Sequence, residues 1–256
     1  MDFARFFAGL DLDDPVPELE RWLAEMAPWT FFLAQGDELA GYAYSELYGD
    51  LGYVRHVVVA AEARGRGVGR ALMRELADRF RAAGATRWEL NVKRDNQRAI
   101  ALYESCGMRA LYATNVLRID WTALPRLPGS ARPLVAQWVE PAHDRDVERA
   151  FRLPDGKVAR LRSLEGMHLA QLVERGAVVA FARFNPAFPG CFPFHVQSPE
   201  LSRPMLEFLR PRSRPEDAWI QLVIEDDDAT TAKLIEAGAR MYLEIVHMGG
   251  AIPSGL

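Results

Sequence analysis

The stretch Arg64-Gly65-Arg66-Gly67-Val68-Gly69 decides the fold of this chain of 256 residues. Residues 57–59, a run of three valines, precede it and favour a buried strand. Apolar residues then recur every four positions, as on one face of an amphipathic helix: Val68, Leu72, Leu76 and Phe80. Gly84 ends that pattern. The sequence therefore predicts a strand, a glycine-rich turn and a helix in direct succession.

The glycine-rich turn has the features of a phosphate site. The first N–H groups of a helix have no partner within the helix, and the helix dipole makes that end attractive to anions. Glycine lets the backbone approach a ligand closely, and Arg64, Arg66 and Arg70 add cationic donors. The turn predicts pyrophosphate binding, with a bare tight turn as the alternative. Its spacing fits neither the dinucleotide fingerprint nor the Walker motif.

The flanking segments predict a mixed α/β layer. Strands are expected at residues 30–34, 39–47, 53–60, 88–92 and 111–119. A second helix is expected from about residue 96, and Gly107 stops it. The order of strands, helix, strand, helix and strand is typical of an α/β fold built on a mixed (α+β) sheet.

A second signature follows at Asn96-Gln97-Arg98-Ala99-Ile100-Ala101-Leu102-Tyr103-Glu104-Ser105-Cys106-Gly107-Met108. The first stretch, in the form Arg64-x-x-Gly67-x-Gly69, resembles the cofactor-binding motif of the GNAT acetyltransferases. The second is similar to that family's Asn-x-x-Ala-x-x-Leu-Tyr-x-x-x-Gly pattern. The resemblance is specific over residues 53–119 and looser over residues 1–52.

The resemblance implies where acetyl-CoA, the cosubstrate, would lie. In the family the cofactor lies between two splayed parallel strands, its pantetheine paired with the backbone of one strand and its pyrophosphate on the glycine-rich turn. The implied cofactor-binding residues are Val57, Val58, Val59, Arg64, Gly65, Arg66, Gly67, Val68, Gly69, Arg70, Asn96, Ala99 and Tyr103. The histidines show no metal-ligand spacing, so no metal is expected.

Tyr103 falls where the family places a hydroxyl facing the thioester sulfur. It is expected to act as the general acid that protonates the departing thiolate, with a core aromatic residue on a helix face as the alternative. Backbone N–H groups around Val58 and Val59 are expected to polarise the thioester carbonyl. The catalytic set comprises Tyr103, Glu89 and Glu46.

The sequence offers several candidates for the general base. Where family members often carry a glutamate, this chain has Tyr53 on one strand and Asn91 on the next. The candidates are Glu89, Glu46, His56 or an ordered water, and His56 has the surroundings of a core histidine. The family usually begins with a strand before two helices, whereas residues 1–10 are apolar and residues 17–26 favour a helix.

The chain also contains an internal repeat. Trp88 and Trp219 lie 131 residues apart, as do Gly107 and Gly238. Residues 121–133 are rich in proline and predict a linker. The sequence therefore predicts two tandem GNAT-like domains, an acetyltransferase domain at 1–122 and a degenerate one at 132–256.

The second repeat has the same expected order of strands and helices but lacks the residues of the two signatures. At the same spacing Asn96 becomes Asp227 and Tyr103 becomes Leu234, while residues 196–200 replace the glycine-rich turn without a glycine and with a negative charge. The expected activity is transfer of an acetyl group from acetyl-CoA to a primary amine of a small molecule, peptide or protein. A non-catalytic acyl-CoA-binding sensor and a scaffold are the alternatives.

Composition limits the partners. A formal net charge of −4 gives no reason to expect nucleic-acid binding, and no apolar run of about 18 residues predicts a membrane span. Two cysteines and the absence of a signal-like N-terminus favour a cytoplasmic protein. A homodimer stays an open alternative.

Overall fold

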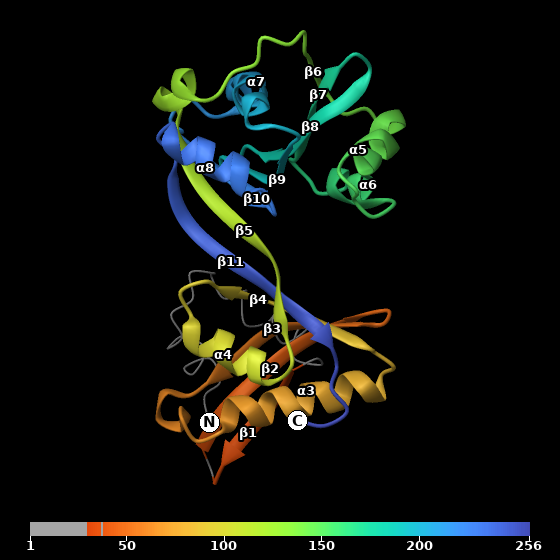
Figure 1. Ribbon diagram of the computed structural model, residues 1–256, viewed down its shortest axis with the longest axis vertical. Coiled ribbons are helices and arrows are strands. Elements are labelled where there is room, and N and C mark those ends of the chain that lie inside the picture. Colours follow the sequence, from red (N-terminus) through yellow and green to blue (C-terminus); the bar gives the residue numbers. More distant parts are fainter. Residues whose placement is uncertain (1–29, 37) are drawn as a thin grey trace. The chain divides into compact units, whose positions relative to one another are not determined.

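The computed structural model describes residues 30–36 and 38–256, and the chain forms two compact units (Figure 1). Unit 1 takes the chain up to Leu111 and adds Val246–Leu256, and unit 2 is Tyr112–Ile245. The apolar segment at 1–10 and the helix predicted at 17–26 lie outside the described residues.

The described part of unit 1 is a mixed sheet with two α-helices at the positions that the sequence predicts. Its strands occur in the order β1-β2-β3-β4-β11, antiparallel from β1 to β3 and parallel between β3 and β4. The elements are β1 (Thr30–Gln35), β2 (Glu38–Tyr48), β3 (Leu51–Val59), α3 (Val68–Ala82), β4 (Arg87–Lys93), α4 (Gln97–Ser105), the beginning of β5 (Arg109–Asp120) and the end of β11 (Arg240–Ala251). The predicted fold class is confirmed.

Helix α3 packs closely on the sheet of unit 1. Its apolar face is buried with Trp88 and Leu90 of β4. A Cβ placed on Gly52 would lie 2.5 Å from the ring of Phe80, so only glycine fits there. Burial of this face holds the start of α3, and thus the glycine-rich turn, against the end of β3.

Strands β3 and β4 diverge after a short paired stretch. Leu51–Val54 pair with Arg87–Leu90, and no pairing to β4 follows. Ser45 of β2 pairs with Val54 and Tyr44 pairs with His56, which leaves Arg55 as an extra residue on β3. Such a bulge bends and twists a strand. Within the described residues, no strand pairs with the edge of residues 55–59 that faces β4.

Unit 2 repeats this design. Its sheet order is β11-β5-β10-β9-β8-β7-β6. Its elements are β6 (Val135–Trp138), α5 (Asp144–Ala150), α6 (Lys157–Arg162), β7 (His168–Glu174), β8 (Ala177–Asn185), β9 (Gly190–Val196), α7 (Ser202–Leu209), β10 (Trp219–Glu225) and α8 (Asp228–Glu236). A buried apolar cluster joins α7 and α8 to one face of this sheet.

The internal repeat is visible in the helix boundaries and their caps. Helices α4 and α8 begin and end 131 residues apart, as do strands β5 and β11. The Asn96 side chain accepts a hydrogen bond from the Ala99 N–H, and the Asp227 side chain accepts one from the Thr230 N–H. Both residues therefore cap their helices in the same way.

The compact units do not coincide with the two predicted domains, residues 1–122 and 132–256. Those domain boundaries describe the repeat in the sequence and stay a prediction. Most of β5 belongs to unit 2, where it pairs with β10. The end of β11 belongs to unit 1, where Val246 and Met248 are buried in the core. The last strand of the first repeat, β5, thus lies mostly in unit 2, and the end of the last strand of the second repeat, β11, lies in unit 1. The two strands hold equivalent positions in the repeat.

Candidate functional site

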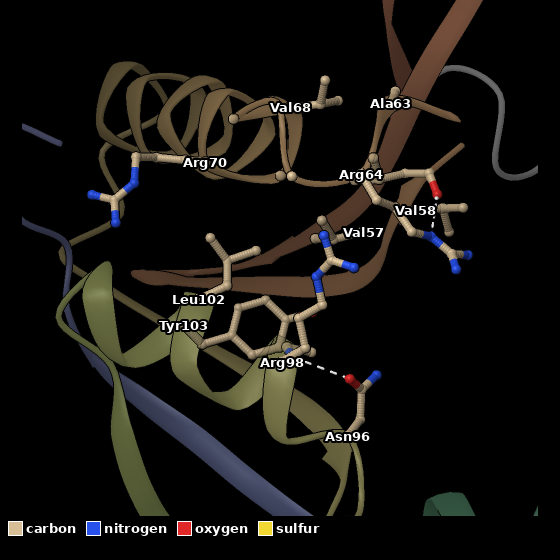
Figure 2. Close-up of a pocket in the computed structure, with 15 residues that line it drawn as sticks. Val57, Val58, Ala63, Arg64, Val68, Arg70, Asn96, Arg98, Leu102 and Tyr103 are labelled. Carbon is tan, nitrogen blue, oxygen red and sulfur yellow. Dashed lines mark hydrogen bonds between the residues drawn. The ribbon is translucent and has the colours of Figure 1, made fainter. Parts of the chain in front are cut away.

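A cleft of about 620 Å³ opens in unit 1 where β3 leaves β4 (Figure 2). Its walls come from the end of β3, the glycine-rich turn, the first turn of α3 and one face of α4. The lining residues are Val57, Val58, Val59, Ala63, Arg64, Gly65, Gly67, Val68, Gly69, Arg70, Asn96, Arg98, Ala99, Leu102 and Tyr103.

The glycine-rich turn presents a row of backbone donors. Gly65 and Gly67 have φ angles of 79° and 82°, in the left-handed region that favours glycine. The N–H groups of these two glycines and of residues 68–70 donate to no acceptor in the described part of the chain. Successive free N–H groups in such a turn form a concave anion site, and the dipole of α3 adds to it.

Arginine side chains surround this row of donors. Arg64 Nε donates to the Val59 carbonyl at 3.3 Å, and Arg70 donates to Ser105 Oγ at 2.8 Å, which links α3 to α4. Arg98 reaches the cleft from α4. Arg66 is the one predicted cofactor-binding residue outside this lining, because it lines a separate pocket of about 50 Å³ with Glu38 and Glu62.

Tyr103 enters the cleft from α4 and is only 8% exposed. Burial raises the pKa of its hydroxyl to about 12, so it stays protonated at neutral pH. Asn96 also lines the cleft, and its side-chain oxygen is occupied by capping α4. A Cβ on Gly69 would lie 2.9 Å from Leu102 Cδ2, so glycine there allows α3 and α4 to approach.

Glu46 lies outside the lining of the cleft, in a polar cluster on β2 and β3. Its carboxylate accepts hydrogen bonds from Tyr44 (2.7 Å), Arg55 Nε (2.8 Å) and Tyr48. Partial burial alone raises the pKa of Glu46, but the hydrogen bonds from Tyr48, Tyr44 and Arg55 outweigh it and lower that pKa. Glu46 is therefore an ionised group whose oxygens are engaged.

Glu89 also lies outside the lining. Arg87 donates to its carboxylate at 3.1 Å, and the Glu89 side chain is 29% exposed. Tyr53 pairs with Glu46 on one side and with Glu89 on the other, so the two carboxylates flank Tyr53 across three strands. The structure thus places both predicted bases beside the point where β3 and β4 begin to diverge. His56 contacts the rings of Tyr42 and Tyr44 on the same two strands.

Three lining residues were not predicted from the sequence: Ala63, Arg98 and Leu102. For the last two a signal was present. Arg98 and Leu102 lie next to the predicted Ala99 and Tyr103 on consecutive turns of α4, so helical periodicity extends the predicted face to them. Ala63 ends a short 3-10 helix whose presence the sequence pattern does not reveal.

The equivalent region of unit 2 differs in its loop and in its helix contacts. Strands β9 and β10 pair at only two positions, but α8 contacts the 3-10 helix Pro199–Leu201 that replaces the glycine-rich turn. Leu234, the counterpart of Tyr103, is fully buried there. Hydrogen bonds from its own backbone N–H and from Ser198 lower the pKa of Glu200, so this loop carries a negative charge. These features agree with the predicted loss of chemistry in the second repeat.

The described residues contain neither a candidate membrane span nor a candidate metal cluster. None of the described helices is long and apolar enough to cross a membrane. Over the same part of the chain, histidine, cysteine and acidic residues form no group of three suited to a metal ion.

Residues 2–108 match the family model of the acetyltransferase (GNAT) family. The chain is 37% identical over 78 residues to the [ribosomal protein bS18]-alanine N-acetyltransferase of Escherichia coli K12, which covers 30% of this chain and 52% of that protein. It is 38% identical over 112 residues to an uncharacterized protein of Mycobacterium leprae, covering 42% of this chain and 30% of the relative. The chain therefore spans about a third to a half of these relatives.

Solved structures resemble the fold over nearly the whole chain. A GCN5-related N-acetyltransferase from Sphaerobacter thermophilus has a TM-score of 0.62 at 19% identity, covering 99% of this chain and 86% of that one. A tandem GNAT protein from the clavulanic acid biosynthesis pathway has a TM-score of 0.59 at 18% identity, covering 90% and 85%. Residues 2–108, which carry the cleft and both signatures, are thus similar to the acetyltransferase (GNAT) family, and the solved structures share the fold of the chain.

Proposed function

We propose that this protein is an acetyl-CoA-dependent N-acetyltransferase that acetylates a primary amine. The observation that carries the proposal is the row of unpaired N–H groups of Gly65 and of residues 67–70 at the cleft that holds the buried Tyr103 hydroxyl. A diphosphate would accept the hydrogen bonds of that row. The amides of pantetheine would pair with the open edge of β3 at residues 57–59.

The reaction follows from these placements. The neutral amine attacks the thioester carbonyl carbon, a C–N bond forms, and the C–S bond breaks with its electron pair going to sulfur. The amine nitrogen loses a proton to a base or a water, and the sulfur gains one. The backbone N–H groups near Val58 and Val59 stabilise the negative charge on the carbonyl oxygen.

Tyr103 acts on the departing sulfur. A cysteine-like thiol has a pKa of about 8.5, which is well below the value of about 12 for Tyr103. Complete proton transfer from Tyr103 to a free thiolate is therefore unfavourable. Tyr103 donates a hydrogen bond to the sulfur as negative charge develops there, and the released thiolate takes its proton from water. Its raised pKa keeps the donor proton in place throughout the neutral range.

Glu89 is the better of the two predicted bases. Glu46 already accepts from Tyr44, Tyr48 and Arg55, so a water would displace an existing partner there. Glu89 has Arg87 as its ion-pair partner and remains partly exposed, so an oxygen is available to a water. We assign Glu89 the role of accepting the amine proton through such a water.

The acceptor is a primary amine of a small molecule, a peptide or a protein. The relative from Escherichia coli is named as an alanine N-acetyltransferase of a ribosomal protein, and this supports a protein or peptide amine as one class to test. A non-catalytic acyl-CoA-binding protein is the second candidate, and one observation favours it. No carboxylate belongs to the described lining of the cleft.

Release of free CoA thiol from acetyl-CoA, measured against a panel of amines, tests the proposal. The wild type is expected to release thiol only with one class of acceptor. Tyr103→Phe is expected to lower kcat by about 10²-fold, as for loss of a positioned acid, while the affinity for CoA stays within about threefold. Tight acetyl-CoA binding without release for any amine would favour the second candidate, and failure to bind acetyl-CoA would exclude both.

A further inference from the structure

Arg98 is a cation of the cleft that neither signature assigns. It lies in the first turn of α4, and one of its terminal nitrogens, Nη2, is 4.0 Å from where a Cβ on Gly65 would be. Figure 2 shows the side chain rising from α4 into the space below the glycine-rich turn and β3. Arg98 therefore approaches the row of backbone donors from the opposite wall of the cleft.

The partners of the three cleft arginines differ. Arg64 is held by the Val59 carbonyl and Arg70 by Ser105 Oγ. Arg98 makes no hydrogen bond or ion pair to any described side chain, and no carboxylate belongs to the lining. Its guanidinium thus faces a helix N-terminus and other cations with no anion to balance them. A multivalent anion bound between them removes this repulsion.

We propose that Arg98 binds the diphosphate of the acyl-CoA from α4, opposite the glycine-rich turn, so that this one group bridges the two walls of the cleft. The inference rests on the proposed function. A guanidinium fits two phosphate oxygens at once, which suits a diphosphate. Gly65 is the first left-handed residue of the turn, and proximity to it places Arg98 on the anion that the turn binds, not on the separate 3′-phosphate of CoA.

Binding of the diphosphate by Arg98 would also hold α4 in place. Arg98 and Tyr103 belong to the same helix, α4, whose nine residues include only one buried side chain, that of Tyr103. Binding of the diphosphate by Arg98 fixes the first turn of this short helix while Tyr103 meets the thioester. The cleft should therefore prefer ligands that carry a diphosphate, beyond the preference that the glycine-rich turn alone provides.

Calorimetric titration of the full chain with CoA, dephospho-CoA and pantetheine tests the assignment. Dephospho-CoA keeps the diphosphate and lacks the 3′-phosphate, and pantetheine lacks both. Arg98→Gln is expected to weaken CoA and dephospho-CoA binding by the same factor, about tenfold or more, and to leave pantetheine binding within about twofold. Arg98→Lys should restore part of the loss, because it returns the charge without the fork of donors.

The control is Arg109→Gln, which removes one exposed positive charge at the start of β5, outside the cleft lining. It is expected to leave all three affinities within about twofold. An effect of Arg98→Gln on CoA alone would move Arg98 to the 3′-phosphate and overturn the proposal, and equal losses for all three ligands would show a structural effect instead. If the wild type binds neither CoA nor dephospho-CoA, the proposed function itself fails; if it binds both and Arg98→Gln changes nothing, only the Arg98 assignment fails.

Discussion

Glu46 and Glu89 carry the same carboxylate in different surroundings, and this difference is the ground for the roles that we propose for them. Both carboxylate oxygens of Glu46 accept hydrogen bonds, from two tyrosines and Arg55, whereas Glu89 has one ion-pair partner. From the sequence both are candidates for the general base, Glu89 through strand alternation. Their hydrogen bonds depend on which side chains stand opposite them across β2, β3 and β4, and this is known only once the strands are paired.

Replacing Glu89 should impair turnover without impairing binding. Glu89→Gln is expected to lower kcat by about tenfold or more while the Kd for CoA stays unchanged, because a glutamine cannot accept the amine proton. Steady-state kinetics together with calorimetry separates the two quantities. The assignment is wrong if kcat of Glu89→Gln equals that of the wild type across the pH range.

Because of its hydrogen bonds, Glu46 should make the free energy of unfolding depend on pH. The pKa of Glu46 is lowered from its ordinary value of 4.5 in the folded chain, so its contribution is present above pH 4.5 and is lost as the pH falls through the lower folded value. Glu46→Gln is expected to lower the urea midpoint at pH 7 and to differ less from the wild type near pH 3. Glu75→Gln, which breaks an exposed pair with Arg79, should show little effect at either pH.

At the scale of elements, the glycine-rich turn and the divergence of β3 from β4 create the cleft. The turn, α3, β4 and α4 were predictable because their signals are local: β-branched runs, four-residue periodicity and stop glycines. The bulge at Arg55 was not, because a bulge is a matter of register between two strands. In unit 2 the sequence predicts the loss of the phosphate-binding residues. It does not predict the contact between α8 and residues 199–201, because that contact is tertiary.

Alanine substitutions at two glycines with similar φ angles test whether the backbone of the glycine-rich turn binds phosphate. Gly67 and Gly84 have φ angles of 82° and 83°, and an added Cβ would meet nothing within 4 Å at either position. An alanine at either site should cost about 1 kcal/mol of unfolding free energy through backbone strain alone. Only Gly67→Ala should also weaken CoA binding, by about tenfold. Equal CoA affinity of the two variants would contradict a phosphate site at the turn.

At the scale of the whole molecule, the exchange of strands makes unit 1 depend on the end of the chain. A Cβ on Gly249 would lie 2.8 Å from the Trp88 carbonyl, so β11 lies hard against β4. The Ile252 N–H donates to the Thr86 carbonyl at 3.0 Å. The spacing of residues in the sequence predicts the internal repeat. Because β5 and β11 have similar patterns of apolar residues, the sequence does not predict which compact unit each strand joins.

Truncation measures this dependence. A chain that ends at Ile245 lacks the buried Val246 and Met248 and leaves an edge of β4 unpaired, so it is expected to lose CoA binding and cooperative unfolding of unit 1. A chain that ends at Ile252 keeps the strand and loses the hydrogen bonds of Arg81 and Arg74 to residues 254 and 256, together with the packing of the partly buried Leu256 on the core. It should bind CoA as the full chain does. Normal binding by the shorter chain would contradict the exchange.

The most direct test of the central claim follows the acetyl group itself. Acetyl-CoA labelled with a heavy isotope in the acetyl group is incubated with the full chain and a panel of amines, and mass spectrometry detects the label on each acceptor. The account predicts label on the nitrogen of one class of amine, in an amount equal to the thiol released, and a sharp drop in both for Tyr103→Phe. Thiol release without labelled amine, or label that is unchanged in Tyr103→Phe, would contradict it.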